Sequence, residues 1–180
     1  MDRYWLLTWT TYGTWLPGDD RGFVSNVRDG AGPEVRHHTS GTQQDAKRRG
    51  LQLAAMSTMK GPPVYLSAQH ATALLGQFQE TARYRGWELD AAAIMANHVH
   101  LVVGVPGDPG PESLLRDLKS YASRRLNQQF DRPVGGTWWT ESGSRRKLPD
   151  ERAILAAVAY VTDQAYPLAV WKGERGASAP

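Results

Sequence analysis

The chain has 180 residues, of which 41% are hydrophobic, and 21 basic and 18 acidic residues give it a net charge of +3. This length and composition predict one globular domain and exclude a disordered chain. The chain has no cysteine, which excludes disulfides, thiolate metal sites and a cysteine nucleophile. The first residues lack the pattern of a signal peptide and no apolar run approaches the length of a membrane span, so we expect a cytoplasmic protein with no membrane partner.

The first quarter of the chain predicts a strand followed by a long irregular excursion. Residues 4–12 are rich in aromatic and β-favouring types, and Gly13 ends this strand. Residues 16–63 are rich in Gly, Asp, Arg and Pro, with a short helix expected near 43–55. Loops of this length are uncommon in compact domains and are often functional.

A helix and two adjoining strands follow. Apolar residues recur at helical spacing in 67–85, and Gly86 ends that helix. Residues 87–96 and 98–105 predict two strands, with Asn97 as the turn residue between them.

The remaining segments predict two helices around a short strand. Residues 111–130 form a helix with proline at its start, and 131–149 contain a short strand or hairpin. A last helix begins at Asp150 and ends before Pro167, and residues 172–180 are expected to form a flexible tail.

This order of elements predicts an α+β fold with one antiparallel sheet. Helices pack on one face of the sheet, which leaves the other face free for function. We expect residues 1–171 to form a single domain, interrupted by the 16–63 loop insertion.

Two histidines are predicted on one face of the second of these strands. Side chains alternate along a strand, so His98 and His100 point the same way while Val99 and Leu101 point to the other face. Two imidazoles at such positions can reach one metal ion. A histidine pair is only half of a metal site, however, and surface or structural histidines are the alternative.

The last helix offers further candidates for the site. Tyr160 and Gln164 lie four residues apart and share a helix face, on which Ala153 and Ala156 leave the phenol accessible. The amide oxygen of glutamine suits a hard ion such as Mg²⁺ or Mn²⁺. The alternative is that Tyr160 packs at the edge of the core and that Gln164 is a surface residue.

Basic residues occur in local clusters despite the modest net charge. Arg124 and Arg125 are adjacent, and Arg145, Arg146 and Lys147 are consecutive. Such clusters can contact phosphates, although a solvated surface is the alternative.

Four segments resemble one family. MANHVHLVV at 95–103 resembles the metal-binding strand of HUH single-strand endonucleases, and YVTDQ at 160–164 resembles the tyrosine helix of their single-tyrosine transposases. TTYGTWLPGDDRGFV at 10–24 and WWTESGSRR at 138–146 resemble the branch of REP-associated tyrosine transposases. The resemblance covers about residues 4 to 166.

The resemblance implies a ferredoxin-like fold in which the C-terminal helix carries the nucleophile. It implies that His98, His100 and Gln164 bind Mg²⁺ or Mn²⁺ and that Tyr160 attacks DNA to form a 5′-phosphotyrosine. The next tyrosine of this segment, Tyr166, lies six residues on, or about 600° around a helix, so a single-tyrosine enzyme is predicted. Tyr121 is a rival nucleophile, with a packing role as its alternative.

The expected partner is single-stranded or hairpin DNA, bound by a monomer or a homodimer. The five basic residues above would contact phosphates, and Trp138 or Trp139 would stack on unpaired bases unless they lie in the core. A non-catalytic nucleic-acid binding module with the same fold is the competing hypothesis. A zinc hydrolase is a third, although the chain has no recognisable motif for one.

Overall fold

The computed structural model describes residues 3–16, 49–107 and 109–174. Five strands form one antiparallel sheet in the order β4-β1-β3-β2-β5. The strands are β1 (Arg3–Thr10), β2 (Glu88–Ile94), β3 (His98–Val105), β4 (Ser144–Leu148) and β5 (Ala169–Lys172). The helices are α1 (Arg49–Ser57), α2 (Ala68–Arg85), α3 (Pro111–Gln129) and α4 (Glu151–Thr162).

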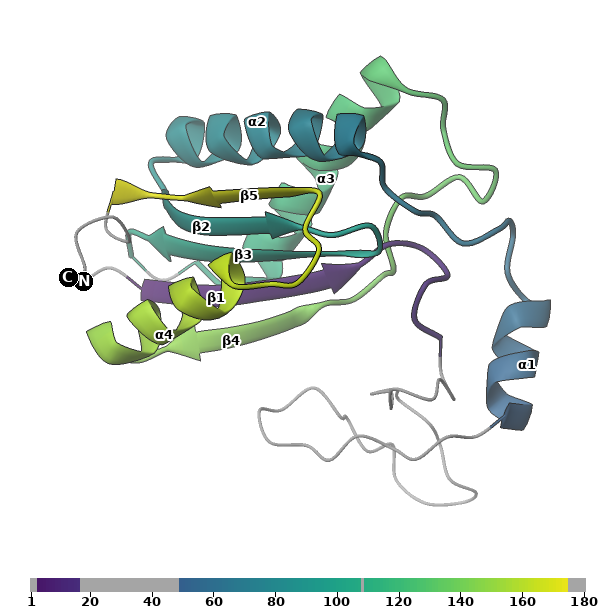
Figure 1. Ribbon diagram of the computed structural model, residues 1–180, viewed down its shortest axis with the longest axis horizontal. Helices are drawn as coiled ribbons and strands as arrows, with labels where there is room; N and C mark the ends of the chain where they lie inside the picture. The colour runs from purple at the N-terminus through teal and green to yellow at the C-terminus, as the bar shows by residue number, and fades with distance from the viewer. Residues whose placement is uncertain (1–2, 17–48, 108, 175–180) are drawn as a thin grey trace.

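The helices lie on both sides of this sheet. In Figure 1, α2 and α3 lie behind and above the sheet, whereas α4 crosses in front of it. The α+β class with a separate C-terminal helix is therefore confirmed. None of the helices in the described part of the chain is long and apolar enough to cross a membrane.

The face under α2 and α3, which we call the helical face, carries the larger hydrophobic core. The edge of Phe78 meets the Trp9 ring with 5.7 Å between ring centroids, and Trp139 lies at 6.0 Å from Trp9 in a similar arrangement. Leu7, Leu74, Val99, Leu101, Leu114, Leu118 and Leu126 fill the surrounding space. Burying large apolar side chains makes this face the main source of stability.

The opposite face, which we call the histidine face, has a smaller core under α4. Ala91 and Ala93 of β2 and Val102 of β3 pack against Ala157 and Val158 of the helix. Helix α4 begins at a capped end, because the Asp150 carboxylate accepts a hydrogen bond from the Ala153 amide at 2.8 Å.

Most predicted boundaries agree with the structure. The strand at 98–105 matches β3, and the helix at 67–85 matches α2 with Ser67 as its N-cap and Gly86 as its left-handed C-cap. Helix α1 partly agrees with the short helix expected near 43–55, while residues 17–48 of the predicted excursion lie outside the described residues.

Two predictions at the C-terminus need correction. Helix α4 ends at Thr162, and the chain then forms strand β5, which was not predicted. Lys172 belongs to β5, and the amide of the buried Gly173 donates to the Asp90 carbonyl at 2.8 Å, so the tail does not begin at 172. Residues 175–180 of the predicted tail lie outside the described residues.

Candidate active site

Three side chains predicted to act together do meet on the histidine face. The rings of His98 and His100 lie 4.7 Å apart between centroids. The ring of Tyr160, on α4, lies 5.4 Å from that of His100. The site is assembled because α4 crosses the sheet over the first residues of β3.

Each histidine ring is held by an oxygen atom at Nδ1. The side-chain oxygen of Asn97 lies 2.7 Å from Nδ1 of His98, and the Thr8 hydroxyl lies 2.8 Å from Nδ1 of His100. Thr8 stands opposite His100 in the register of β1 and β3. An amide oxygen only accepts, so Nδ1 of His98 carries the hydrogen and its Nε2 presents a lone pair. The Thr8 hydroxyl can hold His100 in the same tautomer.

The turn before His98 is fixed by two buried threonines. The carbonyl oxygen of Asn97 accepts hydrogen bonds from the Thr11 amide at 2.9 Å, the Thr11 hydroxyl at 3.1 Å and the Thr14 hydroxyl at 3.2 Å. Thr8, Thr11 and Thr14 were not predicted as site residues. The available signal was a threonine-rich segment at the end of an otherwise apolar strand.

Burial sets the protonation state of His100. The side chain is 5% exposed, and desolvation together with the nearby His98 lowers its pKa from 6.5 to about 4. His100 is therefore neutral at pH 7, which is the form that binds metals.

Tyr160 is accessible to a large substrate. It is 51% exposed, although its ring also contacts that of His100. Gln164 lies just past the end of this helix, where its side-chain nitrogen donates to the Tyr160 carbonyl at 2.8 Å. That bond uses the amide nitrogen, so the amide oxygen is the end suited to an ion.

The donor set fits a divalent ion only in part. Two imidazoles held at Nδ1 are suitable ligands, but no group of three or more His, Asp or Glu suited to a metal occurs within residues 3–16, 49–107 and 109–174. A complete shell therefore needs an amide such as Gln164 or oxygens of a substrate.

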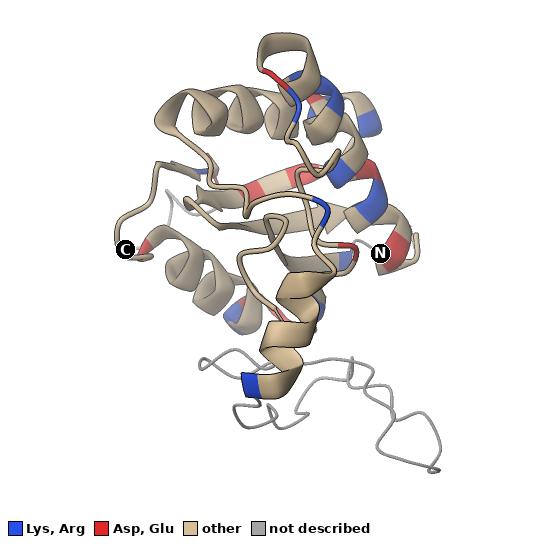
Figure 2. Cartoon of the chain, turned by 90° about the vertical axis from the view of Figure 1, so that its right-hand side faces the viewer, with Lys and Arg blue, Asp and Glu red and all other residues tan. Residues whose placement is uncertain are grey.

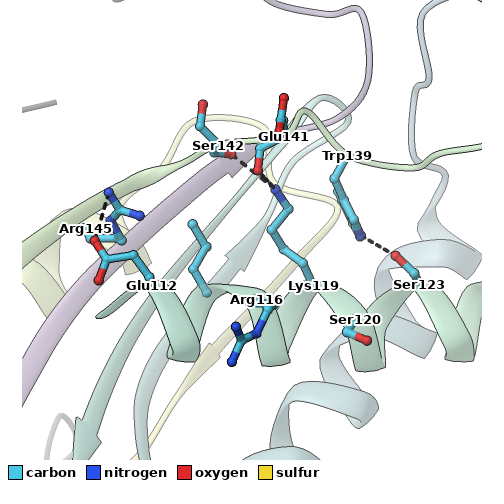
Figure 3. Close-up of a pocket in the computed structure, with 10 residues that line it drawn as sticks. Glu112, Arg116, Lys119, Ser120, Ser123, Trp139, Glu141, Ser142 and Arg145 are labelled. Atoms are coloured by element: carbon cyan, nitrogen blue, oxygen red, sulfur yellow. Dashed lines mark hydrogen bonds and ion pairs between the residues drawn. The ribbon is translucent and has the colours of Figure 1, made fainter. Parts of the chain in front are cut away.

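The basic residues do not form one surface. Arg146 pairs with Leu6, which places it on the histidine face, whereas Arg145 and Lys147 alternate to the helical face. Arg145 contacts Glu112 at 3.3 Å beside a cavity of about 350 Å³ between α3 and β4 (Figure 3). Figure 2 shows positive residues interspersed with negative ones rather than gathered into one patch.

The arginines of α3 have partners on the helical side. Arg125 donates to Gln77 at 2.9 Å and pairs with Glu80, and Arg124 lies over the Tyr121 ring at 5.3 Å from its centroid. Because Tyr121 lies among these α2 and α3 residues, it is on the opposite side of the sheet from the histidines. Tyr166 is 96% exposed in the loop after α4.

Trp138 and Trp139 are core residues. Each is 5% exposed, and their indole nitrogens donate to Asn127 at 2.8 Å and to Ser123 at 2.9 Å. Their burial supports the alternative that both rings lie in the core, and it leaves too little exposed ring surface for either to be a stacking platform by itself.

Comparison with known proteins identifies the family. The family described as "Transposase IS200 like" matches residues 50–164, and the chain belongs to this family of DNA-processing proteins. No curated protein matches the chain.

The solved structures that are similar to the chain include two proteins described as transposases. A REP-associated tyrosine transposase bound to a REP hairpin is 14% identical with a TM-score of 0.44, covering 89% of this chain and 64% of its own length. A Deinococcus radiodurans R1 protein assigned as a transposase is 18% identical with a TM-score of 0.48, covering 92% and 93%. The chain thus spans less than two thirds of the hairpin-bound transposase.

Proposed function

We propose that the protein is a metal-dependent endonuclease and strand transferase that acts on single-stranded DNA containing hairpins. The observation that carries this proposal is the convergence of Tyr160 with His98 and His100. The ring centroids of Tyr160 and His100 lie 5.4 Å apart, and those of His100 and His98 lie 4.7 Å apart. Membership of the transposase family supplies the substrate class. A non-catalytic binding module has no use for this combination.

His98 and His100 would bind Mg²⁺ or Mn²⁺ through Nε2, with the Gln164 amide oxygen as a further ligand. When bound, such an ion neutralises charge on the scissile phosphate and orients it for in-line attack. Thr8 and Asn97 keep the histidine rings in the tautomer that this requires. The burial of His100 keeps it unprotonated, so it does not repel a cation at neutral pH.

Tyr160 is the proposed nucleophile. Its phenolic oxygen forms a bond to phosphorus while the bond from phosphorus to the 3′ oxygen breaks. The phenol loses its proton and the departing 3′ oxygen gains one. The product is a 5′-phosphotyrosine and a free 3′-hydroxyl. Attack by a 3′-hydroxyl on the phosphotyrosine reverses the step and rejoins DNA without ATP, because phosphodiester energy is conserved.

Among the five basic residues predicted to bind DNA, Arg146 is the one placed to contact the backbone near this site, because it shares the histidine face. Arg124, Arg125, Arg145 and Lys147 lie on the other side and would contact only more distant parts of a hairpin. Whether the active form is a monomer or a homodimer remains a prediction.

A covalent-adduct assay tests the proposal. The protein is incubated with Mn²⁺ and a pool of labelled hairpin oligonucleotides, and we expect an adduct that survives denaturing electrophoresis. The adduct should disappear in Tyr160→Phe and in chelator. Tyr166→Phe is the matched control, because that residue is exposed in the neighbouring loop.

The alternatives give different results. An adduct that persists in Tyr160→Phe but disappears in Tyr121→Phe would move the nucleophile to α3. Tight hairpin binding with no adduct would favour the binding module. An adduct that forms in chelator would contradict the role of the metal.

A further inference from the structure

A second concave surface lies at the same end of the sheet as the histidines. A groove of about 860 Å³ is bordered by the start of α2, the end of α3 and segments 62–65 and 131–134. Figure 1 shows the start of α2 and the end of α3, which border this groove, side by side toward the upper right. We refer to it as the amide groove.

Aromatic rings line the amide groove. The ring of His70 lies 4.2 Å from that of Phe130 and 5.3 Å from that of Trp138. Tyr65 lines the same groove and is 64% exposed, so the fold gains little from burying its ring. An exposed aromatic ring beside a concave surface is suited to stacking against a flat ligand.

Amide side chains form a second wall. Asn127, Gln128 and Gln129 follow one another in the last turn of α3, and Asn127 is engaged by the Trp138 indole. Gln128 and Gln129 are exposed at the groove. Amides pair a donor with an acceptor, which matches the hydrogen-bonding edge of a nucleobase and of adenine in particular.

The amide groove is neutral in charge. Its lining contains one arginine, Arg132, and one carboxylate, Asp131. A surface that binds the DNA backbone carries an excess of positive charge. This groove instead combines flat rings and amides without such an excess, which fits bases better than phosphates.

Backbone hydrogen bonds join the amide groove to the candidate active site. The Val64 amide donates to the Tyr12 carbonyl at 2.9 Å, and the Leu66 amide donates to the Ala96 carbonyl at 2.7 Å. Ala96 lies two residues before His98. The groove therefore lies at the end of the sheet where β3 begins, close along the chain to His98.

We propose that the amide groove binds unpaired bases of the single-stranded DNA that adjoins the cleavage point. Tyr65 stacks on a base, and Gln128 and Gln129 read its edge with a preference for adenine. The inference rests on the proposed function, since it takes single-stranded DNA as the substrate.

Binding in chelator separates this inference from catalysis, because no metal-dependent reaction then proceeds. Fluorescence anisotropy is measured with short adenine and thymine homopolymers over a range of salt concentrations. We expect Tyr65→Ala to weaken binding of the adenine homopolymer about tenfold, the order of a lost stacking contact. The salt dependence should not change, because no phosphate contact is lost.

The remaining variants sharpen the test. A Gln128→Ala, Gln129→Ala double variant should lose the preference for adenine over thymine. Tyr84→Ala is the matched control, since Tyr84 is an exposed tyrosine near the opposite end of α2 and outside the groove, and it should bind like the wild type.

Any of the following results would overturn the inference. The first is that Tyr65→Ala binds like Tyr84→Ala, or that the wild type binds neither homopolymer. The second is a weaker salt dependence in Tyr65→Ala, which would mark a phosphate contact. The third is that binding of a proline-rich peptide depends on Tyr65 while binding of DNA does not. If Tyr160 forms no adduct but Tyr65→Ala still weakens DNA binding, the proposed function fails and the proposal for the groove holds. The two failures are therefore distinguishable.

Discussion

The two faces of the sheet are built from the same strands but for different purposes. On the helical face, Trp9 and Leu101 meet Phe78 and other large side chains. On the histidine face, the alternate residues of the same strands form a smaller core, and Thr8 and His100 contact each other beside Tyr160. Because the large apolar core on one face stabilises the fold, the other face can carry polar and exposed side chains that are suited to catalysis.

Removing a large side chain from the helical face should have the greatest effect on stability. Phe78 is fully buried against Trp9, so Phe78→Ala should lower the free energy of unfolding by about 3–5 kcal/mol. Urea denaturation measures this loss. Because the substitution lies away from the histidines, the fraction that remains folded should bind Mn²⁺ with unchanged affinity.

A substitution on the histidine face should affect activity rather than stability. Tyr160→Ala should change the free energy of unfolding much less, since the side chain is half exposed, while removing the covalent adduct. A large loss of stability in this variant, or a change in Mn²⁺ affinity in Phe78→Ala, would break the division between the two faces.

Lys119 connects the two faces, and its replacement should have the next largest effect. Its ammonium donates to the carbonyls of Glu141 at 3.0 Å and Ser142 at 3.2 Å (Figure 3). It also donates to the carbonyl of Thr140, whose hydroxyl meets the Thr10 hydroxyl on the histidine face. Burial lowers the pKa of Lys119 to about 8, against the opposing effect of Glu141.

Lys119→Met keeps the length of the side chain but leaves those carbonyls without the donor. We expect a loss of about 2 kcal/mol in the free energy of unfolding, together with weaker adduct formation. Ser120→Ala, at the exposed neighbouring position of α3, is the control for substituting this helix. Full adduct formation in Lys119→Met would show that the segment 140–142 does not support the histidine face.

Thr8→Val tests how the histidine face holds its rings. Valine has nearly the same shape but removes the hydroxyl at Nδ1 of His100. We expect Mn²⁺ affinity to fall by about 10- to 100-fold, as for other oxygen atoms that orient a metal-binding histidine. Isothermal titration measures the affinity, with Thr72→Val on the surface of α2 as control. Equal affinities in the two variants would mean that Thr8 does not orient His100.

The sequence predicted the parts of the site that depend on local periodicity. The alternation of 98–105 placed two histidines on one strand face, and the structure brings Tyr160 to them. Strand β5 was missed because four residues after a proline carry little pattern, and its pairing with β2 is decided by tertiary contact. The role of Thr8 was missed for the same reason, since its partner lies 92 residues away.

Trp138, Trp139 and the basic residues at 145–147 show more clearly what local sequence cannot predict. Composition identifies residues able to bind DNA, but whether a ring is exposed depends on which helix covers it. Trp138 and Trp139 pack against α3 side chains, and the run at 145–147 divides between the faces because it forms a strand. Neither outcome follows from local sequence, whereas Arg146 on the histidine face could be identified once β4 was paired.

The last expected effect is the pH dependence that His100 gives to stability, which is gradual because it is spread over more than two pH units. Its pKa is about 4 in the folded protein and 6.5 ordinarily. Above pH 6.5 both folded and unfolded chains have a neutral ring. As the pH falls from 6.5 to 4 the unfolded chain gains a proton that the folded chain does not, so the free energy of unfolding decreases. The slope from this group is at most about 1.4 kcal/mol per pH unit.

Urea denaturation in chelator, at several pH values in this window and at neutral pH, measures the effect against a His100→Gln variant. The other titrating groups are shared by the two proteins, so the difference between their slopes reports His100. We expect the variant to lose less stability on acidification than the wild type. Equal slopes would mean that the histidine face tolerates a protonated His100 when folded, which would contradict a ring kept neutral by burial and poised to bind a cation.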